Sequence, residues 1–160
     1  MESTVTITRR GEDRLRSGHP WIYRSDVRDD GAPGGHVVRV VSQKGRLLGR
    51  AIYSDRSQIA LRLVARGDEP VDDAFLRARL ERATLLRRSL GIDGDAYRLV
   101  HAEADGLPAL VVDRYGDVLV VQALAQGSDR WLARIVALLA ELLAPRGILA
   151  RNDARVRELE

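Results

Sequence analysis

The stretch "YRLVHAEADGLPALVVDRYGDVLVVQ", residues 97–122, decides the fold of the second half of the chain. Two apolar runs, 109–113 and 118–126, face one another across "RYG", where Gly116 is available for a positive φ angle. This pattern predicts a β-hairpin. The stretch also carries a histidine and several carboxylates, which raises two other interpretations, an active site and a metal site.

The spacing of these carboxylates argues against one shared catalytic site. Glu103 and Asp105 precede the first hairpin strand, whereas Asp113 and Asp117 flank the turn at its far end. The strand between the two groups would hold them about 16 Å apart, and "DG" and "YGD" are common turn sequences. We therefore expect turn structure here. The alternatives are a metal site with His101, or a small hydrolase built on His101, Glu103 and Asp113.

Amphipathic helices are predicted on both sides of the hairpin. In residues 74–91 and 128–145, apolar side chains recur at spacings of three and four. Side chains that commonly cap helices precede both segments, Asp72 or Asp73 for the first and Ser128 or Asp129 for the second.

A final strand at 146–151 and the start of another helix at 152–160 complete this half. Together with the hairpin and the two helices, these segments predict an α+β domain over residues 72–160.

The N-terminal half has a different character, with several short strands and one short helix. "GDEPVDD" at 67–73 is polar and contains proline, so we place a domain boundary at about residue 70. Residues 1–70 are predicted to form a compact, barrel-like β module. Its segments are a strand at 4–9, a helix ending at Gly18, a strand or turn at 21–23, a loop at 29–35, and strands at 36–43, 46–54 and 58–66.

Composition excludes several classes of site. The 160 residues contain no cysteine, which rules out a disulfide framework, a thiolate zinc site and a cysteine nucleophile in this chain. No glycine-rich loop follows a predicted strand and opens a helix, so we expect no nucleotide or cofactor site. Turn structure explains the carboxylates near His101, so we also expect no metal site. The N-terminus has charges where a signal peptide needs an apolar core, and we expect a cytoplasmic protein.

The positive charge is concentrated in the first half. Residues 1–70 carry 13 basic and 9 acidic groups, although the net charge of the whole chain is +3. Lys44 is the only lysine among 26 basic residues. Arginine suits bidentate phosphate contacts, but a genome rich in G and C would produce the same bias.

The segment 9–26, "RRGEDRLRSGHPWIYRSD", mixes arginines with rings in the way that single-stranded or loop RNA binding requires. The alternative is that Trp21 and Tyr23 are core residues and the arginines are merely solvated. Basic side chains of the first half form the predicted RNA-binding set: Arg9, Arg10, Arg14, His19, Arg24, Lys44, Arg46 and Arg50.

Three segments resemble one enzyme family, in the family's order along the chain. "GHPWIYRSDV" (18–27) resembles the PUA domain that opens a bacterial class I S-adenosylmethionine-dependent 23S rRNA (cytosine-C5) methyltransferase family. Residues 97–122 resemble its central domain, and "LARNDARVRELE" (149–160) resembles the motif that follows. Ala109 replaces a usual glycine and Asn152 a usual serine.

The resemblance implies a fold of class α+β, with a small PUA-like β pseudo-barrel followed by the family's central domain. It implies an RNA-binding portion that positions rRNA for a Rossmann-like catalytic domain lying beyond Glu160. That domain would supply S-adenosylmethionine binding and the thiolate that C5 methylation requires, so we expect no catalysis from this chain alone. The alternative function is a protein–protein interaction module, for example a homodimer without RNA binding.

Overall fold

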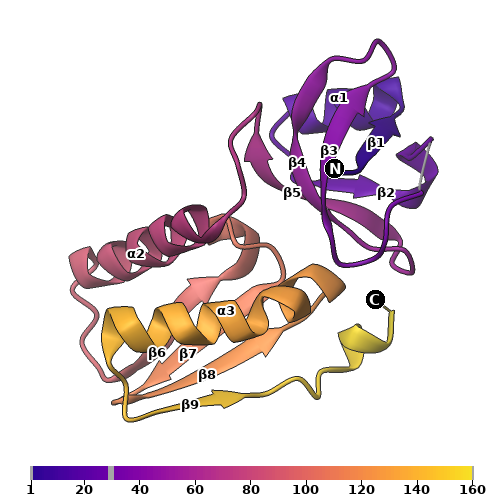
Figure 1. Ribbon diagram of the computed structural model, residues 1–160. Coiled ribbons are helices and arrows are strands. Elements are labelled where there is room, and N and C mark those ends of the chain that lie inside the picture. The colour runs from indigo at the N-terminus through magenta and orange to yellow at the C-terminus, as the bar shows by residue number, and fades with distance from the viewer. Residues whose placement is uncertain (1, 29–30, 160) are drawn as a thin grey trace.

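The computed structural model describes residues 2–28 and 31–159, which form two β-sheets and three α-helices (Figure 1). The predicted α+β class is confirmed. The first sheet has five strands in the order β1-β3-β4-β5-β2. Its strands are β1 (Thr4–Ile7), β2 (Trp21–Tyr23), β3 (Val37–Ser42), β4 (Leu47–Tyr53) and β5 (Ile59–Arg66).

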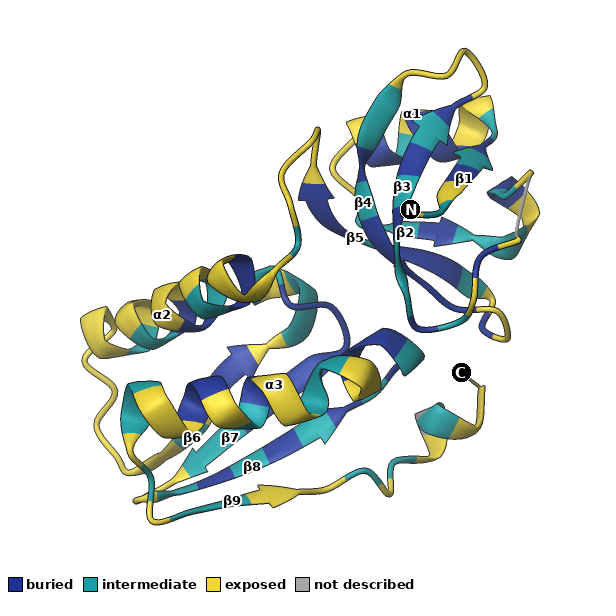
Figure 2. Ribbon diagram, in the orientation of Figure 1, coloured by how far each residue is buried: buried dark blue, intermediate teal, exposed yellow. Residues whose placement is uncertain are grey.

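The first sheet curls around a cluster of buried apolar side chains (Figures 1 and 2). β1 runs parallel to β3, and the remaining neighbours are antiparallel. Buried and partly exposed residues alternate along β3, because successive side chains of a strand point to opposite faces. Helix α1 (Arg9–Arg16) adds Leu15 to this cluster.

The second sheet has the order β6-β7-β8-β9, and α2 and α3 lie against one of its faces (Figure 1). The predicted hairpin is present as β7 and β8, and β9 pairs parallel with β8. The elements of this half are α2 (Asp73–Ser89), β6 (Ala96–His101), β7 (Leu110–Tyr115), β8 (Val118–Ala123), α3 (Gln126–Leu143) and β9 (Gly147–Ala150).

The two helices begin differently from one another. Asp72 caps α2 as expected, because its carboxylate accepts a hydrogen bond from the amide of Phe75 at 2.9 Å. In contrast, α3 begins two residues before the predicted cap, so Ser128 and Asp129 lie inside the helix. The Ser128 hydroxyl accepts a hydrogen bond from the amide of Ala125 and donates one to its carbonyl.

Short 3₁₀ turns complete the described chain, at η1 (Arg24–Asp26), η2 (Ala102–Asp105) and η3 (Arg155–Leu159). The helix expected from residue 152 onward is the last of these turns. The loop predicted at 29–35 falls partly outside the described residues. Within the described part of the chain, no helix has both the length and the apolar character needed to cross a bilayer.

The two sheets are joined by direct packing. The larger buried cluster, which lies under α2 and α3, also contains Ile52, Val64 and Ala65 of the first sheet. A β-carbon at Gly127, in the first turn of α3, would lie 1.9 Å from Cγ2 of Ile52. The glycine therefore allows a close approach between α3 and β4 that no other residue would permit. The division into domains 1–70 and 72–160 stays a prediction.

Candidate nucleic-acid interface

Helix α1 is placed by contacts at its first turn. The Thr8 hydroxyl accepts a hydrogen bond from the amide of Gly11 and donates one to Oδ1 of Asp26 at 2.9 Å. A β-carbon at Gly11 would lie 3.2 Å from Cβ of Asp26. The helix can therefore lie close to the segment that follows β2, and its polar side chains project to either side.

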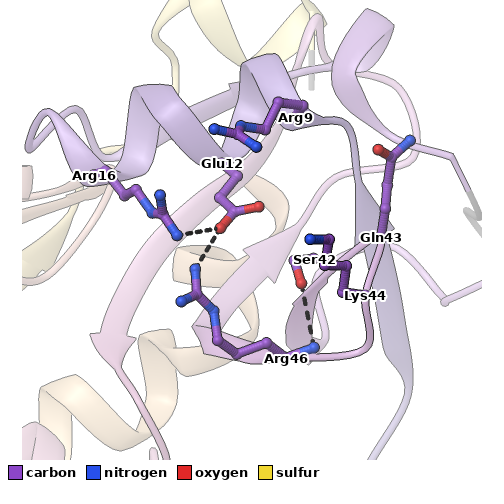
Figure 3. A pocket seen from close by; sticks show the side chains of 7 residues that line it. All are labelled: Arg9, Glu12, Arg16, Ser42, Gln43, Lys44 and Arg46. Atoms are coloured by element: carbon purple, nitrogen blue, oxygen red, sulfur yellow. Dashed lines mark hydrogen bonds and ion pairs between the residues drawn. The ribbon is translucent and has the colours of Figure 1, made fainter.

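On one side of α1 lies a hollow that we call the basic pocket (Figure 3). Its volume is about 380 Å³. The helix supplies one wall, and the end of β3 with the turn into β4 supplies the other. The lining residues are Arg9, Glu12, Arg16, Ser42, Gln43, Lys44 and Arg46.

Glu12 organises the guanidinium groups of this pocket. The residue is buried, and its Oε1 accepts an ion-pair contact from Arg16 Nη2 at 2.8 Å. The same oxygen also accepts a hydrogen bond from Arg46 (Figure 3). One carboxylate thus holds two guanidinium groups from different elements side by side, which restricts the conformations that either arginine can adopt.

The other two cations of the pocket, Lys44 and Arg9, do not contact Glu12. Among the described residues, the Lys44 ammonium has no hydrogen-bond or ion-pair partner. Arg9 pairs with Asp13, one helical turn away, at 3.2 Å, and both side chains are largely exposed. Four cations therefore surround one buried carboxylate. Such a pocket can accept an anion of phosphate type through charge-assisted hydrogen bonds.

Arg10 and Arg14 lie on the other side of α1 and face Asp26. Arg10 Nε donates to Asp26 Oδ1 at 2.6 Å, and Arg14 Nη2 lies 3.8 Å from Asp26 Oδ2. The Arg14 guanidinium also lies over the ring of Tyr23, 4.6 Å from its centroid. These two predicted RNA-binding arginines are therefore separated by the helix from those that line the basic pocket.

Arg24 has its partners inside the first sheet. It donates hydrogen bonds to the Tyr53 hydroxyl at 3.0 Å and to the carbonyls of Ser54 and Ser57. These contacts hold the loop between β4 and β5 against β2. The geometry gives Arg24 a structural role, and its predicted contact with RNA stays a prediction.

Arg50 is similarly engaged at the end of the module. It pairs with Glu2 at 2.9 Å and with Asp68 at 3.0 Å, and it donates to the carbonyl of Glu69. The hydrogen bond to Glu2 raises the pKa of the Arg50 guanidinium above its ordinary value, so the group stays charged. Arg50 therefore ties both ends of the first module together rather than lining the basic pocket.

His19 and Trp21 lie where the two sheets meet. The Trp21 indole donates from Nε1 to Glu103 Oε1 at 2.7 Å, and the guanidinium of Arg62 lies 5.6 Å from the ring centroid of Trp21. His19 is exposed and accepts a hydrogen bond at Nδ1 from the amide of Trp21. Trp21 is thus half-buried. It is neither a fully buried core residue nor a fully exposed ring for RNA stacking, the two alternatives considered from the sequence.

The carboxylates of 101–117 do not converge. Glu103 contacts Trp21, Asp105 forms a bidentate pair with Arg87 at 2.6 and 2.7 Å, and Asp113 pairs with Arg98. The hydrogen bond to Asp113 raises the pKa of Arg98. Within the described ranges, no three His, Cys, Asp or Glu side chains are grouped as metal ligands. Most of these acids are thus partners of structural arginines rather than turn residues alone.

Three residues that line the basic pocket, Arg9, Lys44 and Arg46, belong to the RNA-binding set predicted from the sequence, and the other lining residues do not. Glu12 and Arg16 lie three and seven positions after Arg9, which is the spacing of one helix face. This spacing could have placed Glu12 and Arg16 beside Arg9 from the sequence. The approach of Ser42 and Gln43 to α1 depends on the parallel pairing of β1 with β3, which no local pattern specifies.

Comparison with known proteins gives consistent results. Residues 5–66 match a family model described as a PUA-like domain. Over 156 residues, the chain is 41% identical to ribosomal RNA large subunit methyltransferase I of Shewanella amazonensis, covering 93% of this chain and 39% of the relative. For the protein of the same name in Vibrio cholerae, identity is 37%, covering all of this chain and 41% of the relative.

Solved structures agree in fold. A candidate S-adenosylmethionine-dependent methyltransferase from Streptococcus mutans superposes with a TM-score of 0.81 at 17% identity, over 93% of this chain and 41% of that one. A candidate methyltransferase complexed with SAH gives a TM-score of 0.82 at the same identity and covers 40% of that chain. The chain therefore spans about two-fifths of the length of the proteins it matches.

Proposed function

Because the chain is similar to the N-terminal two-fifths or so of ribosomal RNA large subunit methyltransferase I, we propose that it is the RNA-binding portion of an rRNA methyltransferase. In this proposal it holds rRNA in position for a catalytic domain that corresponds to the rest of the relatives' length. Methylation at C5 of a cytosine is the reaction that the sequence resemblance implies. The expected compartment is the cytoplasm, where bacterial rRNA lies.

The basic pocket is the observation that supports this proposal most strongly. It places Arg16 and Arg46 in fixed orientation on Glu12, with Lys44 and Arg9 beside them. Phosphate contacts supply a large share of the affinity of nucleic-acid-binding proteins and make that affinity depend on salt. A pocket with an excess of cations, built on a PUA-like fold, is suited to an RNA backbone.

In the parts of the chain that the structure describes, the turns from β1 to α1 and from β8 to α3 do not fit S-adenosylmethionine. A dinucleotide-type site needs a glycine-rich turn between a strand and the exposed N-terminus of a helix. Gly127 follows β8 and opens α3, but Ile52 occupies the space beside it. Thr8 fills the corresponding turn between β1 and α1. Cofactor binding would therefore belong to the part of the relatives that this chain does not match.

Fluorescence anisotropy with labelled fragments of 23S rRNA tests the proposal. We expect the double variant Arg9→Glu, Lys44→Glu to bind at least 10-fold more weakly than the unchanged chain at low salt. The double variant Arg146→Glu, Arg151→Glu is the matched control, since it makes the same charge change at two exposed arginines that lie beyond α3. Equal affinity of all three proteins would contradict the proposal. A stable dimer in sedimentation without RNA affinity would favour the alternative of an interaction module.

A further inference from the structure

Helix α1 separates two surfaces of different chemistry. Arg9, Glu12 and Arg16 share the face that lines the basic pocket. Arg10 and Arg14, four residues apart, share the face toward Asp26 and β2. The first surface offers charges alone. The second combines a guanidinium group with aromatic rings, and the proposed phosphate contacts do not account for it.

The Arg14 guanidinium is held from two directions. It lies over the ring of Tyr23, 4.6 Å from the centroid, and its Nη2 lies 3.8 Å from Oδ2 of Asp26, an ion pair without a hydrogen bond. Asp26 is itself 1% exposed and anchored by the Thr8 hydroxyl and Arg10, so it is a fixed partner. Arg14 nevertheless remains 28% exposed. The side chain thus forms a flat, oriented cation with part of its surface open to solvent.

More rings line the same edge of the molecule. Trp21 and Tyr23 lie two residues apart on β2 and share one face of this strand, whereas Ile22 points into the core. β2 is the last strand of its sheet, with β5 as its sheet neighbour. Exposed His19 meets Trp21 edge to face, with ring centroids 5.6 Å apart. The rings of His19, Trp21 and Tyr23 therefore lie along this strand, Arg10 and Arg14 of α1 face it, and Arg62 lies over Trp21.

We propose that Arg14 and Tyr23, with His19 beside them, form a stacking subsite for unpaired nucleobases. An RNA strand would cross α1, with a phosphate in the basic pocket and a base on Arg14. This inference rests on the proposed function and names its substrate class as single-stranded RNA. In a duplex, neighbouring base pairs cover the base faces, whereas unstacked bases can lie on aromatic rings or on guanidinium planes.

The width of α1 supports two distinct contacts. With its side chains, a helix is about 10–12 Å across. The pocket and the Arg14–Tyr23 pair on opposite sides of it therefore cannot contact the same phosphate group. A second contact on Arg14 must involve another part of the strand, either a base or a second phosphate, and an abasic strand distinguishes the two.

Arg14→Lys tests the subsite, because it keeps the charge and removes the planar group. The probes are a single-stranded RNA oligonucleotide, an abasic strand of equal length and a duplex. For the unchanged chain we expect the tightest binding to the single strand with bases. Arg14→Lys should weaken that binding roughly 5- to 100-fold, as expected for the loss of one stacked base, and change affinity for the abasic strand by less than 2-fold.

Tyr23→Leu should give the same selective loss, and Tyr115→Leu is its matched control, since Tyr115 is exposed on the second sheet. Equal weakening on all three probes, or no weakening, would overturn the stacking subsite. A different result would contradict the proposed function itself. In that case the double variant Arg9→Glu, Lys44→Glu would bind every probe as well as the unchanged chain does.

Discussion

The indole nitrogen of Trp21 lies 2.7 Å from Oε1 of Glu103, although 82 positions separate these residues in the sequence. This hydrogen bond joins the edge strand of the first sheet to the turn that precedes the hairpin of the second. Together with the packing of Gly127 on Ile52, it fixes the basic pocket relative to the second sheet. An RNA strand held by α1 would therefore have a defined position relative to that sheet.

Trp21→Phe should lower the free energy of unfolding by about 1.5–3 kcal/mol, because it removes a hydrogen bond to a charged acceptor. Urea denaturation measures this change. Trp131→Phe is the control: no hydrogen bond of the Trp131 indole is seen within the described residues, and the expected loss is smaller. Equal losses for the two variants would show that the bond to Glu103 contributes little.

Glu12→Gln should weaken RNA binding several-fold, even though it makes the basic pocket more positive. The carboxylate holds Arg16 and Arg46 in place, and a neutral amide cannot hold two guanidinium groups in the same way. Asp13→Asn makes the same charge change on the exposed part of α1. We expect that control to bind at least as well as the unchanged chain in anisotropy measurements. Tighter binding by Glu12→Gln would show that net charge matters more than orientation.

Salt dependence separates the residues that contact phosphate from those that support the fold. Each phosphate contact to a single strand contributes about 0.7 to the slope of log K against log salt. Lys44→Ala should therefore reduce the magnitude of the slope by about 0.7.

Arg50→Ala should leave this slope unchanged and lower thermal stability, since Arg50 contacts Glu2, Asp68 and Glu69. Melting curves and titrations at several salt concentrations measure both effects. A reduced slope for Arg50→Ala, with an unchanged melting temperature, would indicate that Arg50 contacts RNA phosphate and does not support the fold.

Gly127→Ala should destabilise the chain by roughly 1–3 kcal/mol, the usual cost of overpacking. The added β-carbon would lie 1.9 Å from Ile52 Cγ2, so α3 must move away from β4. Gly147→Ala is the control, because a β-carbon there meets no atom of the described residues within 4 Å. Ile52→Ala also removes a buried side chain, so the double variant with Gly127→Ala should lose less stability in thermal denaturation than the sum of the two single losses. A neutral Gly127→Ala variant would contradict the close packing.

Several elements could be predicted from local sequence because local chemistry determines them. The side chain of Asp72 caps α2, and Gly116 adopts a positive φ between the hairpin strands. The spacing of apolar residues in 74–91 predicts a buried stripe of Phe75, Leu76, Leu80, Ala83, Leu86 and Leu90, and the first four are buried. Leu86 and Leu90 continue the same spacing but are 47% and 63% exposed, so the described chain does not cover this stripe at the end of the helix, although Arg87 beside it pairs with Asp105. Helical periodicity predicts which face of a helix is apolar. It does not predict how many turns of that face are buried against other elements.

The candidate site was harder to predict because its residues come together through long-range pairing. Composition identified a basic first half, but it could not separate Arg46, which lines the basic pocket, from Arg24 and Arg50, which bind other parts of the protein. All three are arginines in the same compositional segment. Their roles differ according to which carboxylate or carbonyl the fold brings near each one, and that depends on the register of β3, β4 and β5.

Amide shift mapping by NMR, during titration with a single-stranded rRNA oligonucleotide, shows which surface of the protein RNA contacts. We expect the amides of residues 9–16 and 42–46 to shift most, and those of residues 146–150 not to shift. Large shifts confined to the second sheet, with none around the basic pocket, would contradict this expectation.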